Sequence, residues 1–278
     1  MFFSAADKAE GPSFVPSDRL AHGGKQFLPW WLSQLRAYEK KRRRRLVDTV
    51  DVHFYPQGEG MGLYGEGLTD LDTSVRRIRS VRALWDPSYT DESWIAEPQR
   101  LIPRLKEWIA AEDPGLGISI GEYNFGAENH VSGGLAVAEA LGRFGEQGVE
   151  AAFYWPLPPR NSAAYWAFRA FRNYDGEGAK AGNDSVHARL SDQGLSSVFA
   201  TRREDGTLVL VALNEEPAKP MDLGVDPGSC GRFQLEREFS FTGVNGLAPV
   251  RKPSPPPRIH SRLAPWSIHV LELKPAAR

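Results

Sequence analysis

The chain changes character near residue 173, and this change limits the folds open to it. From residue 28 to about 160, segments with apolar residues at helical spacing alternate with short β-prone runs. After residue 173, β-prone runs follow one another with turn residues between them. Strands separated by helices predict βαβ units in a parallel sheet, whereas consecutive strands predict an all-β module. We therefore expect an α/β part, residues 1–173, followed by a β-sandwich, residues 174–278.

The α/β part has too few strand–helix units for a closed barrel. Strand patterns occupy residues 46–56, 117–126 and 149–158, and helical patterns occupy residues 27–41, 100–113, 133–148 and 163–174. A complete eight-stranded barrel requires about 250 residues. The α/β part is therefore predicted to be either a small sheet or part of a larger barrel. In the β module, Asp205-Gly206 between two strand runs predicts a hairpin.

Composition excludes several classes of function. The net charge of −1 gives no reason to expect a nucleic-acid partner, and the basic run 40–45 is interpreted as a solvated helix end. The single cysteine, Cys230, excludes an internal disulfide and a cysteine-rich metal site. No apolar run approaches 18 residues, so no membrane span is expected. Residues 1–14 lack a basic region and a long apolar run, so no signal peptide is expected in this chain.

Polar and aromatic residues gather at the ends of the three predicted parallel strands. In the first strand a period of two places His53 and Tyr55 on one face at its C-terminal end. The second strand ends in Glu122, Tyr123 and Asn124, and the third ends in Trp155. A carboxylate at a strand end also fits a strand that has simply reached the surface. However, active sites of parallel barrels form at this end of the strands, so the three ends together predict a site.

The residue types at these strand ends suit glycoside chemistry. Glycosidases use two carboxyl groups, one as the acid and the other as nucleophile or base, and tryptophan faces suit sugar rings. Glu122 is the candidate carboxylate, and Glu128, a few residues further on, is expected to matter little. The sequence LNEEP, residues 213–217, offers further carboxylates, but it ends a strand of the all-β module. We interpret it as an ordinary solvated turn.

Several segments of the chain, in order and spacing, resemble glycoside hydrolase family 44. They are DVHFYPQG, RSVRALWDPSYTDESWI, LIPRLKEWI, GEYNFG, LGRFGEQGVEAAFYWPLP, FRNYDGEGAKAGNDSV and LSSVFATRREDGTLVLVALNEE. The resemblance implies a (β/α)8 TIM-type barrel packed on a β-sandwich, with this chain supplying strands six to eight of the barrel and the sandwich. It also implies an endo-acting, retaining β-1,4-glucanase on cellulose, carboxymethyl cellulose or xyloglucan, and an extracellular location.

The family's motifs also imply roles for individual residues. Glu122 corresponds to the nucleophile, Trp155 to a sugar platform, and Trp85 and Trp94 to a cleft wall in the loop after strand six. Gly121 stands where the family usually has threonine, and Phe125 where it usually has tryptophan. Nothing in this chain matches the acid/base glutamate, which is therefore expected outside it.

The expected ligands and the alternatives follow from the same residues. The substrate-binding set comprises His53, Tyr55, Trp85, Trp94, Tyr123, Asn124 and Trp155. No cofactor is expected to be required, although the loop carboxylates Asp175, Asp184 and Asp205 are candidate ligands of a structural Ca²⁺. Two alternatives stay open: a catalytically deficient carbohydrate-binding remnant of the same architecture, and a non-enzymatic module that binds another protein.

Overall fold

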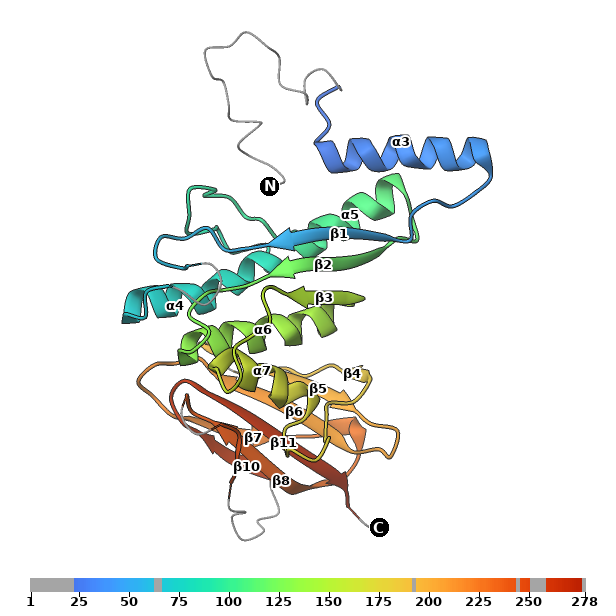
Figure 1. Ribbon diagram of the computed structural model, residues 1–278. Helices are drawn as coiled ribbons and strands as arrows, with labels where there is room; N and C mark the ends of the chain where they lie inside the picture. The colour runs from blue at the N-terminus through green and yellow to red at the C-terminus, as the bar shows by residue number, and fades with distance from the viewer. Residues whose placement is uncertain (1–22, 63–66, 192–193, 244–245, 251–258, 277–278) are drawn as a thin grey trace.

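The computed structural model describes residues 23–62, 67–191, 194–243, 246–250 and 259–276 (Figure 1). Residues 1–14, on which the absence of a signal peptide was predicted, lie outside this part of the chain. Within the described residues, no helix combines the length and the apolar character needed to cross a membrane.

Three parallel strands form the sheet of the α/β part. They are β1 (Thr49–Phe54), β2 (Gly117–Tyr123) and β3 (Ala151–Tyr154), in the order β1-β2-β3. In the described residues β1 and β3 each pair only with β2, so the strands do not close into a barrel. The sequence predicted all three strands, and it also predicted that they would be too few for closure.

Helices follow the pattern expected for βαβ units, with one addition. The predicted helices are α3 (Phe27–Arg42), α5 (Leu101–Glu112), α6 (Val131–Gln147) and α7 (Ala163–Arg172). A further helix, α4 (Leu71–Ser80), continues into the 3-10 turn η1 (Val81–Leu84) within a segment that was predicted to be a loop. The sequence marks the start of this helix with Asp70, whose side chain accepts a hydrogen bond from the backbone N–H of Thr73 and so caps the helix.

The C-terminal half is a six-stranded sheet with a two-stranded sheet beside it. The large sheet has the order β4-β5-β6-β11-β8-β9 and comprises β4 (Asp184–Val186), β5 (Ser196–Arg202), β6 (Leu208–Asn214), β8 (Phe233–Phe241), β9 (Ala248–Pro249) and β11 (Ser267–Pro275). The small sheet pairs β7 (Met221–Val225) with β10 (Ile259–Leu263). The predicted hairpin at Asp205-Gly206 is confirmed, because β5 and β6 pair antiparallel around it.

The two halves share one hydrophobic core. Figure 1 shows α6 and α7 between the three-stranded sheet and the six-stranded sheet. The buried side chains of these helices, such as Leu135 and Ala167, belong to the same apolar cluster as Val211 and Val270 of the large sheet. The parallel strands are therefore held on the sheet half by packing and not by a flexible linker.

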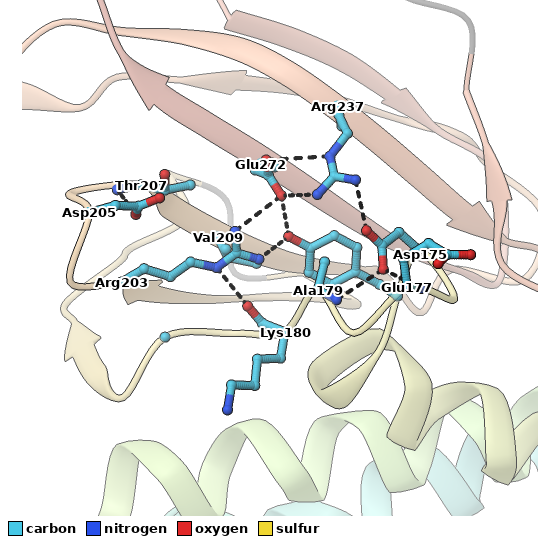
Figure 2. A network of polar contacts seen from close by, with 12 residues as sticks. Asp175, Glu177, Ala179, Lys180, Arg203, Asp205, Thr207, Val209, Arg237 and Glu272 are labelled. Carbon is cyan, nitrogen blue, oxygen red and sulfur yellow. Dashed lines mark hydrogen bonds and ion pairs between the residues drawn. The ribbon is translucent and has the colours of Figure 1, made fainter.

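A polar network fastens the segment after α7 to the large sheet (Figure 2). The Tyr174 hydroxyl donates to the Glu272 carboxylate and accepts from the Arg203 guanidinium. Arg237 donates to Glu272 and to Asp175, each at 2.8 Å. Tyr174 is almost fully buried, and burial together with its bond to Glu272 raises its pKa. The network therefore holds the junction between the two halves with its buried polar atoms paired.

Candidate active site

A one-residue bulge in β2 decides which way Glu122 points. Val52 of β1 pairs with Ile120, but the next residue, His53, pairs with Glu122, so Gly121 is skipped. Along β1, Val52 is buried and His53 is exposed, as a period of two requires. Without the extra residue, Glu122 would share the buried face of Ile120. The bulge therefore brings its carboxylate to the face of His53, and β-bulges often re-aim side chains in this way next to active sites.

The side chains of His53, in β1, and Tyr55, directly after β1, approach the same oxygen of Glu122. The Tyr55 hydroxyl donates a hydrogen bond to Oε2 over 3.0 Å, and His53 Nδ1 lies 3.3 Å from that oxygen. The Glu122 side chain is 33% exposed, so the carboxylate stays accessible while its direction is fixed. The structure thus brings together three of the predicted residues, one from β2 and two from the end of β1.

Gly121 also makes room for a second carboxylate on the same face. A Cβ atom at this position would lie 2.2 Å from Asp51 Oδ2, which is a severe overlap. Asp51 accepts a hydrogen bond from the Ser119 hydroxyl across the β1–β2 pair. Glycine at position 121 therefore leaves the space in which Asp51 contacts Ser119.

Two predicted substrate-binding residues are instead buried, which corrects the sequence interpretation. The Tyr123 ring is fully buried and packs edge-on against Phe144 and Tyr154, and burial raises the pKa of its phenol. Asn124 is also fully buried, and its amide donates to the main-chain carbonyl of Trp155 over 2.7 Å. Neither side chain presents a surface to a sugar, because the chain turns inward after Glu122.

The three predicted tryptophans occupy different environments. Trp155 is 50% exposed just after β3, and its backbone N–H donates to the Tyr123 carbonyl at the end of β2. Trp94 is 55% exposed in the segment between η1 and α5. Trp85 lies under the guanidinium of Arg143, which is 3.9 Å from its ring centroid and belongs to α6. Arg143 also lies over the Phe199 ring of β5, so Trp85 is held at the junction with the large sheet. The contact of all three tryptophans with a sugar stays a prediction.

Sequence reasoning missed a fully buried arginine behind this end of the strands. Arg77 of α4 donates to the carbonyls of Phe125, Met61 and Leu68 at 2.8–3.1 Å, and its Nη1 lies 2.9 Å from the Ser132 hydroxyl. Burial lowers its pKa to about 10. It thereby connects the segments that follow β1 and β2. The sequence gives no signal that distinguishes it from the neighbouring arginines of the same helix.

The structure bears on two further interpretations of carboxylates. Glu128, expected to matter little, is only 2% exposed and lies against Asn124. Glu215, interpreted as part of a solvated turn, has a buried Oε1, and burial followed by the charge of Glu139 raises its pKa well above the usual range. The solvated-turn interpretation is therefore wrong for Glu215, whereas the small effect expected of Glu128 on activity stays a prediction.

The candidate Ca²⁺ ligands do not form a cluster in the described part of the chain. Asp175 accepts hydrogen bonds from Arg237 and two backbone N–H groups, and Asp205 accepts one from the N–H of Thr207 (Figure 2). Across the described residues, no group of three or more His, Cys, Asp or Glu side chains is arranged to hold a metal ion. Binding of Ca²⁺ near Asp175, Asp184 or Asp205 stays a prediction.

Comparisons of the sequence and of the structure with known proteins point to the same protein family. The sequence profile of glycoside hydrolase family 44 matches residues 2–58. Endoglucanase A of Paenibacillus lautus is 36% identical over 225 residues, which are 78% of this chain and 31% of that protein. The crystal structure of CelM2, a bifunctional glucanase-xylanase from a metagenome library, is 34% identical and superposes with a TM-score of 0.86. A Paenibacillus polymyxa family 44 xyloglucanase, solved with xyloglucan, is 30% identical with a TM-score of 0.83.

These relatives are all polysaccharide-cleaving enzymes, and the matching sequence profile and the xyloglucanase name the same family. The chain belongs to glycoside hydrolase family 44. The CelM2 match covers 97% of this chain and 51% of CelM2, and the xyloglucanase match covers 99% and 55%. The chain therefore spans about half the length of these solved relatives and 31% of the curated endoglucanase.

Proposed function

We propose that this chain carries the nucleophile and part of the sugar-binding rim of a retaining endo-β-1,4-glucanase. The observation that carries the proposal is the Glu122 carboxylate, turned to the exposed face of the sheet by the bulge and held by Tyr55. In this proposal β1, β2 and β3 are strands six to eight of a (β/α)8 barrel, residues 1–173, and residues 174–278 form its β-sandwich domain. The substrate class is β-1,4-linked glucan, including cellulose, carboxymethyl cellulose and xyloglucan.

The geometry of Glu122 suits attack on an anomeric carbon. Tyr55 and His53 both approach Oε2, so we assign Oε1 to the attack. The bond from Oε1 to C1 forms as the bond from C1 to the leaving oxygen breaks, and a general acid protonates that oxygen. Water then cleaves the glycosyl-enzyme ester, with the same acid group now acting as base, and the starting anomeric configuration is restored. Carboxyl groups alone carry this reaction, so it requires no cofactor.

The acid/base glutamate is proposed to lie outside this chain. Retaining enzymes place their two carboxyl groups about 5–5.5 Å apart. Asp51, a carboxylate on the exposed face of β1, accepts a hydrogen bond from Ser119 and lies two residues before His53 in the strand. A partner carboxyl supplied by the opposite barrel wall satisfies the mechanism. Because the substrate is a polymer too large to enter a cell, the proposal includes an extracellular location, which detection of the protein in culture supernatant tests.

The proposal is tested with the missing acid supplied. The N-terminal half of CelM2, fused ahead of residues 1–278, is assayed for release of reducing sugar from xyloglucan. Glu122→Gln is expected to lower turnover by several orders of magnitude, because no nucleophile remains. The matched control is Glu204→Gln, which changes an exposed glutamate in the β5–β6 turn and should leave the rate unchanged. Equal rates for the parent fusion and Glu122→Gln would refute the proposal.

A second candidate is a carbohydrate-binding protein without catalysis, favoured by the engagement of Asp51 with Ser119. Glucan-affinity electrophoresis separates the two candidates. Retardation by xyloglucan without hydrolysis in the fusion would support the binding protein. Neither retardation nor hydrolysis would leave the third interpretation, a module that binds another protein.

A further inference from the structure

The backbone of Trp155 is fixed to the end of β2 on both sides of the residue. Its N–H donates to the carbonyl of Tyr123 over 3.1 Å, and its own carbonyl accepts from Asn124 Nδ2 over 2.7 Å. The residue as a whole is nevertheless 50% exposed. The residue therefore combines a fixed backbone with an accessible aromatic face, which is what a sugar platform requires.

Asn124 is in turn fixed by the turn that it begins. Its Oδ1 accepts from the N–H of Gly126 over 2.7 Å, and its Nδ2 lies 3.3 Å from Glu128 Oε1. Asn124 is fully buried and Glu128 is 2% exposed, so water does not compete for these contacts. Burying a carboxylate is costly without a hydrogen-bond partner, which Asn124 supplies here. The Glu128 main chain is held as well, because its carbonyl accepts from the N–H of Ala164 in α7 over 3.0 Å.

The turn has little conformational freedom. Ala127 has φ 47°, a left-handed conformation that residues other than glycine rarely adopt. A Cβ atom on Gly133 would lie 2.3 Å from the Ala127 carbonyl oxygen, so α6 packs directly against the turn. Such strain persists only where the surroundings impose it, and it concentrates at functional sites.

We propose that Asn124 and Glu128 form a positioning bracket that sets the Trp155 indole at the glucan-binding rim. The inference rests on the proposed function, because it takes Trp155 as the sugar platform. Asn124 and Glu128 are positioning residues, since they are buried and act through the Trp155 backbone. Glu128 is thereby assigned a role that no sequence motif indicated.

The test uses residues 1–278 labelled with 5-fluorotryptophan. The chain has eight tryptophans, and Trp155→Phe assigns the ¹⁹F resonance of Trp155 by its loss. Asn124→Asp keeps the size of the side chain, removes the donor to the Trp155 carbonyl and places a second carboxylate beside Glu128. Glu128→Leu removes the oxygen that accepts from Asn124 and leaves Asn124 itself unchanged. Glu128→Gln keeps an accepting oxygen on a side chain of the same size. The last two variants keep the test valid if Asn124→Asp does not fold.

Asn214 provides a matched control in the other half of the molecule. It is also buried, its Nδ2 donates to the carbonyls of Lys219 and Ala264 at 2.9 and 2.8 Å, and its Oδ1 accepts from the N–H of Glu216. Asn214→Asp should therefore disturb stability to a similar degree. It should leave the Trp155 resonance and the affinity for cellohexaose unchanged.

The expected result is a shifted and narrowed Trp155 resonance in Asn124→Asp and Glu128→Leu, with affinity for cellohexaose lowered about 3- to 10-fold. Glu128→Gln should stay within about twofold of the parent, and Trp155→Ala should lose at least as much affinity as Asn124→Asp. A Trp155 resonance and an affinity that match those of Asn214→Asp would overturn the bracket, and so would a moved resonance with unchanged affinity. A Trp155→Ala chain with full affinity, or a parent chain that does not bind cellohexaose, would instead refute the proposed rim function and the inference with it.

Discussion

The Tyr55 hydroxyl donates a hydrogen bond of 3.0 Å to Glu122 Oε2 across the β1–β2 pair. Tyr55 thereby fixes the direction of the carboxylate that we assign as nucleophile. Tyr55→Phe removes this bond and keeps the ring. In the fusion with the N-terminal half of CelM2, we expect kcat to fall about 10- to 100-fold, because hydrogen bonds to charged groups contribute about 1.5–3 kcal/mol.

The control for Tyr55→Phe is Tyr38→Phe on the exposed surface of α3. It should leave kcat unchanged. A Tyr55→Phe enzyme as fast as Tyr38→Phe would show that the bond does not orient the reacting carboxylate.

Gly121→Ala should destabilise the sheet at the bulge. The added methyl group would lie 2.2 Å from Asp51 Oδ2, and overpacking of this kind typically costs about 1–3 kcal/mol. The free energy of unfolding in urea measures the effect. Gly145→Ala in α6 is the control, since no atom lies within 4 Å of its added Cβ, and it should be neutral or stabilising. Equal stabilities for the two variants would contradict the close approach of Asp51 to Gly121.

The raised pKa of Glu215 predicts that the folded chain loses stability as the pH rises. Burial, and next the charge of Glu139, raise the pKa of Glu215 well above its usual range. The folded chain therefore binds this proton more tightly than the unfolded chain, so this contribution to stability declines as pH rises from the ordinary glutamate range through the folded pKa. Glu215→Gln has no such proton and should be more stable than the parent at pH 8, with little difference near pH 4.

Urea unfolding of the parent, Glu215→Gln and the exposed control Glu204→Gln at pH 4, 6 and 8 measures this difference. Parallel pH profiles for all three proteins would show that the Glu215 carboxyl is not affected by its surroundings in this way.

Residues 1–278 on their own should be a poor catalyst and prone to association. The apolar side chains at the end of β3 are exposed, with Phe153 at 60%, Trp155 at 50% and Leu157 at 87%. Unpaired edges of parallel strands invite association, and general acid catalysis typically contributes about 10²–10⁴-fold. We expect hydrophobic dye binding, self-association in sedimentation and negligible hydrolysis of xyloglucan. A monodisperse, cooperatively melting chain with the rate of the CelM2 fusion would show that a second carboxyl within these residues serves as the acid.

The sequence predicted the three strands and the exposed face of β1 because a period of two is visible in Val50, Val52 and Phe54. It also predicted that Glu122 lies beside His53 and Tyr55, since strand ends of a parallel sheet meet at one edge. It did not reveal the bulge. The apolar pattern of β2 already ends at Gly121, so an extra residue at this position does not change the pattern.

The buried polar residues could not be predicted for a different reason. Asn124 and Glu128 look like an exposed turn, and only the packing of Gly126 and Ala127 of that turn against α6 shows that the turn is enclosed. Arg77 lies among other arginines of an amphipathic helix, and its burial depends on carbonyls from segments up to 48 residues away. Tertiary contacts of this kind have no local signature.

Covalent trapping tests the central claim, that Glu122 is the nucleophile, most directly. A 2-deoxy-2-fluoro-β-cellobioside with a dinitrophenyl leaving group needs no general acid for the first step, and the fluorine slows hydrolysis of the ester that forms. After incubation with the CelM2 fusion, mass spectrometry of the peptides should find the sugar on Glu122, and the Glu122→Gln fusion should stay unlabelled. A sugar on Glu128, Asp51 or any other carboxylate would contradict the account.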